Sequence, residues 1–456
     1  MPTECVITGI GCVSAVGVGI GPTWEALCSG SSGLRAISAF DASAFPCSVG
    51  GEVFEGDTLL SARNYVPKSY RKATKVMARD TQLAVAAAAL AVRDAGLVTR
   101  ESQQDPAEFT YAPEELGCHI GAGLIAAEAD EIASAFVTAK DDAGRFSLRE
   151  WGEHGIGNLQ PLWMLKYLPN MLACHVTIIH GAEGPSNTIT CSEASGLMSV
   201  GESRRIIERG AAKACLSGGI ESKVNAMGIS RMGLCNRFAE IDSGDPEPWR
   251  AIRPYDVEAP GGVPGEGGGI IVLEDAAHAN KRGARVYAEL AGFGSAHAQM
   301  RTLGIATEFD CGMGAPVEED EGLTDAIQVA LRDAGISPDQ VDAIIPAASG
   351  VRLMDTAELG ALERVFGDRL SEIPLAVLTP YVGQLFAGSG AFGLAVGAMM
   401  ISEQRLPARI HAGRPDGRVL AGASESVGAD LRYVVVCTGS LAGQAAAAVL
   451  RRPDLE

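Results

Sequence analysis

The sequence predicts an α/β protein built from two similar halves. Apolar strand-like segments alternate with helical segments along the chain, and one short string occurs twice: Ala91-Val-Arg-Asp-Ala-Gly-Leu recurs as Ala330-Leu-Arg-Asp-Ala-Gly-Ile. Both copies are followed by an apolar segment that ends in glycine, at 116–123 and at 341–350. Such alternation with an internal repeat is typical of layered α/β architectures with a duplicated unit.

The first half begins with a predicted strand at 5–11 that runs into a glycine turn. Residues 81–95 are alanine-rich and predict a helix that ends at Gly96. This helix is apolar nearly all round, so we expect it to be buried. A second helix is predicted over 324–335 with the same glycine stop.

The middle of the chain alternates in the same way. A strand at 188–190 precedes a helix that is expected to start near Ala194 and to run to Gly210, and another strand follows at 214–220. The proline-rich stretch 240–269 is predicted to be mainly loop, followed by a strand at 270–274. The C-terminal part is predicted to hold a strand, a glycine turn and a last apolar stretch.

Composition excludes several functional classes. The chain has 456 residues, a net charge of −19, and 20% charged residues, which argues against nucleic acid as the main partner because phosphate binding needs a basic face. Its 11 cysteines form no CxxC pair and show no metal-ligand spacing. We therefore predict no metal site and reduced thiols in a cytoplasmic protein. The start of the chain lacks a targeting pattern, and apolar runs such as 84–92 are too short to cross a bilayer.

Three long stretches resemble the β-ketoacyl-acyl-carrier-protein synthase family of the thiolase-like fold. They are VITGIGCVSAVG near the N-terminus, the segment 184–222, and the segment 264–294, with support from 341–367 and 382–391. The resemblance covers nearly the whole chain. It implies two pseudo-duplicated halves, which we place at 1–262 and 263–456, in αβαβα layers.

The family's condensation chemistry needs one cysteine and two histidines, and the resemblance places all three at other residues here. A cysteine at a helix N-terminus has a lowered thiol pKa and takes the acyl chain, and the histidines support decarboxylation and stabilise the enolate oxyanion. Glu193 stands at the cysteine position, Ala347 at the first histidine, and Gln384 at the second. A lysine usual in the family is replaced by Thr379. No catalytic residue is therefore expected in this chain.

A sequence that matches the family but lacks all three groups resembles the chain length factor, or ketosynthase β subunit, of type II polyketide synthases. Those proteins carry a pattern similar to E-Q-A-G-G-L where this chain has Ser192-Glu-Ala-Ser-Gly-Leu. Their counterpart of the first histidine motif resembles A-x-G-A-G-V-P-E-L-D, and here it is Pro346-Ala-Ala-Ser-Gly-Val-Arg-Leu-Met-Asp. The departure from that subgroup is glutamate in place of glutamine at 193.

Two roles are open for Glu193. Its carboxylate could cap the following helix by accepting backbone N–H bonds. Alternatively, it could mimic a charged intermediate and promote decarboxylation of malonyl groups, as is proposed for the glutamine-bearing relatives. The nearby thiol of Cys191 lies on the approaching strand, where a thiol in apolar surroundings is usually inert.

The resemblance also suggests surfaces for partners. Residues 163–176 occupy the place of the family's dimer interface, where chain length factors close the polyketide tunnel; Met171, Leu172, Cys174 and His175 are candidate tunnel or interface residues. The run from Arg63 to Arg79 carries no acidic residue, and Lys68, Arg71, Lys72 and Lys75 are candidates for docking an acidic acyl carrier protein. An ordinary solvated face explains that run equally well.

The function implied is that of a non-condensing subunit that pairs with an active ketosynthase α subunit and shapes the tunnel that sets polyketide chain length. The alternatives are a malonyl-carrier-protein decarboxylase that makes the starter unit, and a homodimeric scaffold. Substrates are expected on the phosphopantetheine of an acyl carrier protein, with no cofactor of the chain's own and no membrane or nucleic-acid partner.

Overall fold

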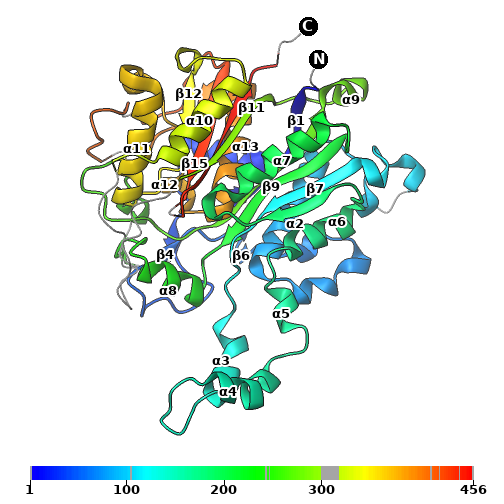
Figure 1. The fold of residues 1–456 in the computed structure, drawn as a ribbon, viewed down its shortest axis with the longest axis vertical. Helices are drawn as coiled ribbons and strands as arrows, with labels where there is room; N and C mark the ends of the chain where they lie inside the picture. The colour runs from blue at the N-terminus through cyan, green and yellow to red at the C-terminus, as the bar shows by residue number, and fades with distance from the viewer. Residues whose placement is uncertain are drawn as a thin grey trace.

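In a computed structural model, the repeat seen in the sequence is a repeat in space. The structure describes residues 3–102, 105–241, 244–245, 247–298, 318–410, 413–420, 422–440 and 442–453. Within this part, ten strands form one mixed sheet in which nine follow the order β12-β15-β16-β11-β1-β10-β9-β7-β8, and the short β2 pairs with β1 (Figure 1). Their bounds are β1 Cys5–Ser14, β2 Gly17–Val18, β7 Leu116–Gly121, β8 Ser186–Ile189, β9 Ala214–Ser222, β10 Glu266–Asp275, β11 Ala288–His297, β12 Ala343–Ile345, β15 Tyr433–Gly439 and β16 Gln444–Arg451.

The two groups of strands meet at the antiparallel pair β1 and β11. The outer strands of each group are parallel, as in the pairs β7–β9 and β12–β15, and the inner ones are antiparallel. The strand β10 follows the predicted division at residue 262 in the chain, but it pairs with β1 and β9 of the first group. The position of that division stays a prediction.

Helices cover both faces of each group of strands and lie between the two groups. Helix α2 (Arg79–Asp94) packs on β1, and helix α10 (Glu321–Asp333) packs on β11. Helices α7 (Ser195–Glu208) and α13 (Ser389–Glu403) contact each other and strands of both groups, so they form the central layer. This arrangement confirms the expected thiolase-like fold with two halves in αβαβα layers.

The remaining helices are shorter or peripheral. They are α1 Ile20–Ser29, α3 Ala129–Thr138, α4 Leu148–Glu150, α5 Trp163–Lys166, α6 Met171–His180, α8 Ala226–Leu234, α9 Ala276–Lys281, α11 Arg352–Phe366 and α12 Thr379–Val382. The stretch predicted as loop before 270 contains a short 3-10 turn at Pro248–Ala251, and β10 already begins at Glu266. The last apolar stretch of the chain is the strand β16.

The aspartate in each copy of the repeated string accepts a hydrogen bond from the backbone of a neighbouring strand. Asp94 at the end of α2 accepts the backbone N–H of Ile10 at 2.8 Å, and Asp333 at the end of α10 accepts that of Phe293 at 2.9 Å. Both strands are irregular just before these contacts, between Ile7 and Gly9 and between Leu290 and Gly292. The short sequence echo therefore marks a structural unit in which a helix end is tied to a bulged strand.

Glycines let these helices approach their strands closely. A Cβ added to Gly11 would lie 1.9 Å from the carbonyl oxygen of Ala87 in α2, and one added to Gly294 would lie 2.1 Å from that of Ala326 in α10. The alanine-rich helix α2 is buried along most of its length, as its composition predicts. The small residues on both sides of each contact are therefore required by packing.

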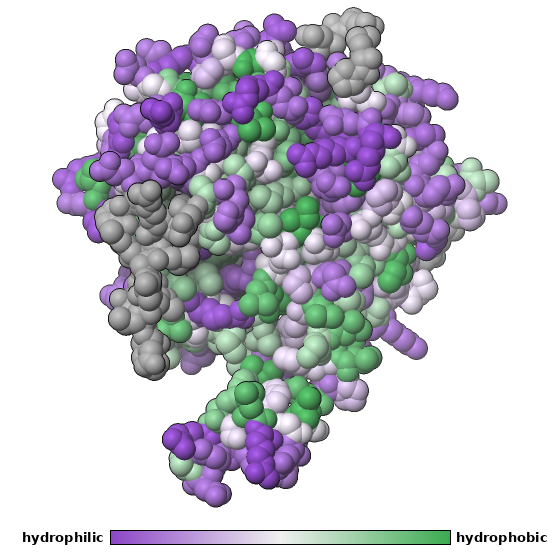
Figure 2. All heavy atoms as spheres, viewed as in Figure 1, coloured by the Kyte–Doolittle hydropathy of each residue, from purple (hydrophilic) through white to green (hydrophobic). Residues whose placement is uncertain are grey.

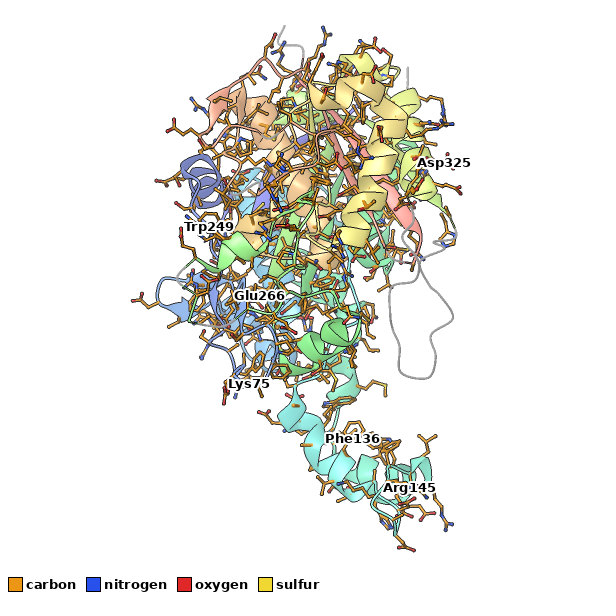
Figure 3. The ribbon with its side chains drawn as sticks, turned by 90° about the vertical axis from the view of Figure 1, so that its left-hand side faces the viewer. Lys75, Phe136, Arg145, Trp249, Glu266 and Asp325 are labelled. Atoms are coloured by element: carbon orange, nitrogen blue, oxygen red, sulfur yellow. The ribbon has the colours of Figure 1, made fainter. Side chains whose placement is uncertain are left out.

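One segment, residues 129–166, projects from the body as an arm (Figures 1 and 3). It includes α3, α4 and α5, and Phe136 and Arg145 mark its outer part in Figure 3. Its side chains include many exposed apolar groups: Phe136, Val137, Phe146, Leu148, Ile156, Leu162, Met164 and Leu165. Figure 2 shows hydrophobic surface on this arm and on the adjoining part of the body.

One helical stretch within the described residues, Phe386–Glu403, is long and apolar enough to cross a membrane by length and composition. The runs considered from the sequence, such as 84–92, were shorter. Because 83% of this stretch is buried inside the protein, it is the central core helix of the fold.

Replacing Gly11 or Gly294 with alanine is expected to lower the free energy of unfolding by about 1–3 kcal/mol, because backbone on the facing helix must move. The matched control is Gly21→Ala in α1, where an added Cβ meets nothing within 4 Å. Urea denaturation of the three variants checks this. Equal stability of all three would contradict the role given to the close contacts.

Candidate functional site

Glu193 lies in a short 3-10 turn, Ser192–Ala194, that leads directly into α7. Its side chain is buried, and its Oε1 lies 2.6 Å from the Nη1 of the equally buried Arg237. Burial is the largest single effect and raises the pKa of the Glu193 carboxyl, but the charge of Arg237 together with hydrogen bonds from Arg237, Ser192 and the backbone holds that pKa below its ordinary value. Glu193 is therefore one half of an internal ion pair, a role that neither sequence-based interpretation included.

Arg237 joins two of the three replaced positions. Its Nη2 donates to the side-chain oxygen of Gln384 at 3.0 Å, and the amide nitrogen of Gln384 donates to the carbonyl of Ser349 at 2.9 Å. The guanidinium also lies over the ring of Phe386, with Cζ 4.9 Å from the ring centroid. Glutamate, arginine and glutamine thus form one connected group where the family's chemistry would require a thiol and imidazoles.

The third position, Ala347, brings only its backbone to the site. Its N–H donates to Glu358 at 2.7 Å, and that of Ala348 donates to the same carboxyl at 2.9 Å. Thr379, at the position of the missing lysine, donates its hydroxyl to the carbonyl of Ala348 at 2.5 Å. These contacts hold the turn in place, and the side chain at 347 itself is only a methyl group.

The backbone at the site is unusual for residues other than glycine. Ser192, Asn236, Ala348 and Phe386 have φ values of 53°, 50°, 44° and 49°, and the first three directly adjoin Glu193, Arg237 and Ala347. Such left-handed conformations cost about 1–3 kcal/mol each and cluster at functional sites. Strained backbone is therefore concentrated next to Glu193, Arg237 and Ala347.

Little space is left beneath these turns. The cavity lined by Ala347, Thr379, Gly383 and Thr438 has a volume of about 20 Å³, and one water molecule needs about 10–15 Å³ measured in this way. An acyl chain does not fit there in this conformation. A much larger cavity of about 800 Å³ is lined in part by Phe238, whose ring packs edge-on against Phe386.

Cys191 offers no substitute for the missing nucleophile. Its backbone N–H donates to the hydroxyl of Ser195 at 2.8 Å, and burial raises the pKa of its thiol. A raised thiol pKa lowers the fraction of reactive thiolate.

With this geometry in view, the relatives of the chain can be assigned. The model of the β-ketoacyl synthase N-terminal domain matches residues 3–279, and that of the C-terminal domain matches residues 297–413. The chain belongs to the β-ketoacyl synthase family. It is 30% identical over 414 residues to the 3-oxoacyl-[acyl-carrier-protein] synthase 2 of Rhizobium meliloti, covering 90% of this chain and 89% of that protein. It is 29% identical to the enzyme of the same name from Staphylococcus aureus, covering 90% and 91%.

Solved structures of ketosynthases have the same fold. One contains a type II polyketide synthase acyl-carrier protein in complex with its ketosynthase bound to the hexaketide, with a TM-score of 0.80, 22% identity and full coverage of both chains. Another is the ishigamide ketosynthase/chain length factor, with a TM-score of 0.80, 24% identity and full coverage of both chains. At these identities the likeness establishes the ketosynthase fold.

The tunnel candidates lie on α6, and the structure separates them by exposure. Leu172 is fully buried in the core of the first half, whereas Met171 and Cys174 are half-buried. His175 is buried, and its Nδ1 lies 2.8 Å from the hydroxyl of Tyr70; burial lowers the pKa of its imidazole. Met171 and Cys174 are thus the two candidates that reach the surface of this chain.

The four docking candidates Lys68, Arg71, Lys72 and Lys75 are exposed and lie on short 3-10 turns at 68–76. Lys75 lies near the place where the arm leaves the body (Figure 3), and α5 of the arm contacts the turn that carries it. Arg79, the last basic residue of the run, points inward and pairs with the buried Glu266. The exposed part of the basic run is therefore a compact patch beside the arm.

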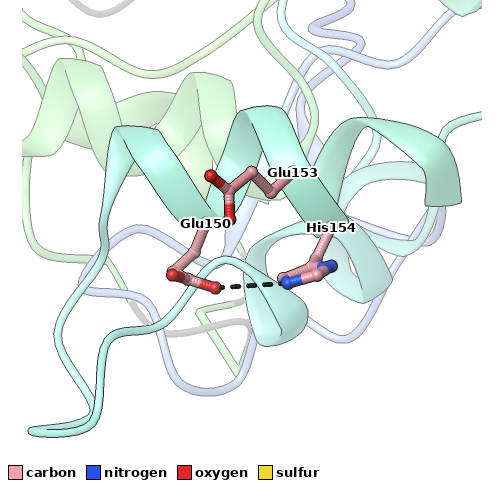
Figure 4. Close-up of side chains that lie close together, drawn as sticks. All are labelled: Glu150, Glu153 and His154. Carbon is pink, nitrogen blue, oxygen red and sulfur yellow. Dashed lines mark ion pairs between the residues drawn. The ribbon is translucent and has the colours of Figure 1, made fainter.

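One group of three side chains in the described part of the chain has metal-ligand spacing: Glu150, Glu153 and His154, on the arm (Figure 4). All three side chains are partly or fully exposed to solvent. Glu153 pairs with Arg149 at 3.0 Å, and His154 lies 3.7 Å from Glu150. These are surface pairs along a helix, so we assign no metal site to them.

Glu193→Ala is expected to lower the free energy of unfolding by about 3–5 kcal/mol, because it leaves the buried Arg237 without its counter-charge. The double variant Glu193→Ala/Arg237→Met should lose less than the sum of the two single losses. Arg145→Ala, which removes a largely exposed pair with Asp141, serves as the control and should change stability by less than about 0.5 kcal/mol. Strictly additive losses in urea denaturation would contradict the pairing.

The buried carboxyls of Glu358 and Asp355, which accept hydrogen bonds from the turn that contains Ala347, make the free energy of unfolding depend on pH. Burial raises the pKa of Glu358 to about 7 and that of Asp355 to about 6. Because both are raised above their unfolded values, their contribution to stability is present in mild acid and is lost as pH rises toward 7, by about 1.4 kcal/mol per unit of difference. Glu358→Gln should flatten this decline between pH 5 and pH 7, measured by urea denaturation at each pH. The exposed control Glu372→Gln should retain the wild-type slope.

Proposed function

We propose that this chain is the non-condensing subunit of a heterodimeric ketosynthase, a chain length factor, and that an active ketosynthase α subunit supplies the cysteine and both histidines. The observation that carries the proposal is the buried Glu193–Arg237 pair. It occupies the nucleophile position with a carboxylate and ties it through the guanidinium to Gln384, at the second histidine position.

The pair also argues against the alternative of a malonyl-carrier-protein decarboxylase. A carboxylate that is paired with a buried guanidinium is not available to act on a substrate, and none of the described residues at the three positions is a histidine that could stabilise an enolate oxyanion. The synthase relatives at about 30% identity match nearly the whole chain. Under this proposal, Glu193, Ala347 and Gln384 are the residues that distinguish this chain from a condensing enzyme.

Two surfaces support a partner subunit. The strand β8 ends the sheet and leaves one edge unpaired among the described strands, which is a template for strand pairing with another chain. The arm exposes large apolar side chains, including Phe146, Leu148 and Met164 at 51%, 79% and 66%. Contiguous exposed apolar surface of this kind marks interaction sites.

The basic patch at Lys68, Arg71, Lys72 and Lys75 fits an acidic acyl carrier protein by charge. Substrates would arrive on its phosphopantetheine, and the complex would act in the cytoplasm. The product of the complex would be a polyketide, either aromatic or a reduced polyene.

Co-expression with a ketosynthase α subunit tests the proposal. We expect a stable one-to-one complex that extends an acyl chain with units from malonyl-carrier protein. This chain alone should give neither condensation nor release of carbon dioxide from malonyl-carrier protein. Analytical ultracentrifugation and product mass spectrometry measure the two properties. A purified homodimer that decarboxylates malonyl-carrier protein by itself would show that the proposal is wrong.

Met171→Ala in the co-expressed complex is expected to lengthen the product, because a smaller side chain at the tunnel end leaves room for further acetate units. Leu172→Ala is unsuitable for this test, since removing a buried leucine costs about 2–5 kcal/mol in stability. The exposed Ile178→Ala on the same helix is the control. Mass spectrometry of the products decides, and unchanged length in the Met171 variant would remove its tunnel role.

A further inference from the structure

A second buried ion pair also lies close to the ring of Phe386. Lys223 and Glu221 are paired and almost completely buried, with side-chain exposures of 6% and 3%. The Nζ of Lys223 lies 5.8 Å from the centroid of the Phe386 ring, whose other cationic neighbour is Arg237 at 4.9 Å. The ring therefore connects this pair to the Glu193–Arg237 pair.

The Glu221–Lys223 pair holds two segments that are far apart in sequence. Glu221 accepts the backbone N–H of Ala387 at 2.9 Å, while the Nζ of Lys223 donates to the carbonyl of Leu124 at 2.9 Å. Gly123 lies directly against the carboxylate, since an added Cβ would be 1.9 Å from its Oε1. The loop that follows Gln384 and the segment that follows β7 are thus fixed by the same two side chains.

The segment fixed by Lys223 leads into the arm. Leu124 is 65% exposed between buried neighbours, and α3 of the arm begins five residues later at Ala129. The far end of the arm is tied to this region as well, because Glu128 donates its N–H to the hydroxyl of Tyr167 at 3.2 Å. The position of the Leu124 backbone therefore sets where the exposed apolar surface begins.

A buried ion pair adds little net stability compared with apolar residues of the same shape. Its directional donors and acceptors do fix geometry, because each bond requires one carbonyl or N–H at one place. The Glu221–Lys223 pair forms hydrogen bonds with the backbone of Leu124 and Ala387. It is therefore suited to positioning the segments that contain these two residues.

We propose that Lys223 and Glu221 are positioning residues that fix the segment 122–128, so that Leu124 and the base of the arm are presented to the partner subunit in one arrangement. The partner is the ketosynthase of the proposed function, and the presentation of Leu124 rests on that function. The fixing of the segment itself does not depend on it.

The test is the double variant Lys223→Met/Glu221→Gln, which removes the pair without leaving an unpaired charge. Hydrogen exchange of the isolated chain should show at least about tenfold faster exchange of the amides at 122–128. The affinity for the co-purified ketosynthase should fall by about tenfold or more. Gly123→Ala, which displaces the Glu221 carboxylate and changes no charge, should have the same local effect.

The matched control is Arg282→Met/Glu274→Gln, which removes another ion pair with a fully buried carboxylate, near the end of β10. It should leave exchange at 122–128 unchanged. Exchange in this segment that is no faster in the Lys223 and Gly123 variants than in the control overturns the inference. If the complex forms and the variants exchange faster at 122–128 but bind the ketosynthase with unchanged affinity, the proposed presentation of Leu124 to the partner is wrong. A wild-type chain that binds no ketosynthase contradicts the proposed function instead, and exchange still decides the positioning role.

Discussion

The guanidinium of Arg237 is buried among segments that are distant in sequence, and the arrangement of the site depends on keeping it paired. Glu193 supplies the counter-charge, Gln384 accepts a hydrogen bond, and Phe386 covers the planar group. An unpaired guanidinium in this place would cost several kcal/mol. The replacements at 193 and 384 therefore form a mutually dependent set, which explains physically why they occur together.

The scaffold around this set is that of a ketosynthase. Left-handed residues adjoin the replaced positions, and glycines allow backbones to meet where side chains cannot fit. For example, a Cβ on Gly219 would lie 2.3 Å from the carbonyl of Ala387, and one on Gly388 would lie 2.2 Å from that of Gly267. A fold can retain such costly turns while its chemistry changes, because the turns are held by packing and the chemistry by a few side chains.

The same reasoning connects the site with the surface. The two buried ion pairs share the ring of Phe386, and the second of them reaches the backbone of Leu124 at the foot of the arm. In a condensing enzyme this region must accommodate substrate. Here the void beneath the turns holds about one water molecule, so this closely packed region is well suited to serve as a rigid junction between the core and the exposed arm.

The sequence by itself determined the plan of two α/β halves, the helices that are α2, α7 and α10, and the residue types at the positions where the resemblance expects a cysteine and two histidines, because these follow from local periodicity, from glycine stops and from residue identity. The repeated string with its aspartates, Asp94 and Asp333, was visible as a pattern before its contacts were known. Only the tertiary structure decided that Glu193 pairs with Arg237, that Lys223 reaches Leu124, that Arg79 points inward and that Leu172 belongs to the core. A buried cation as the partner of Glu193 was not predicted from the sequence. Which of the chain's arginines and lysines supplies it depends on contacts between residues 44 positions apart or more, and no local pattern encodes such contacts.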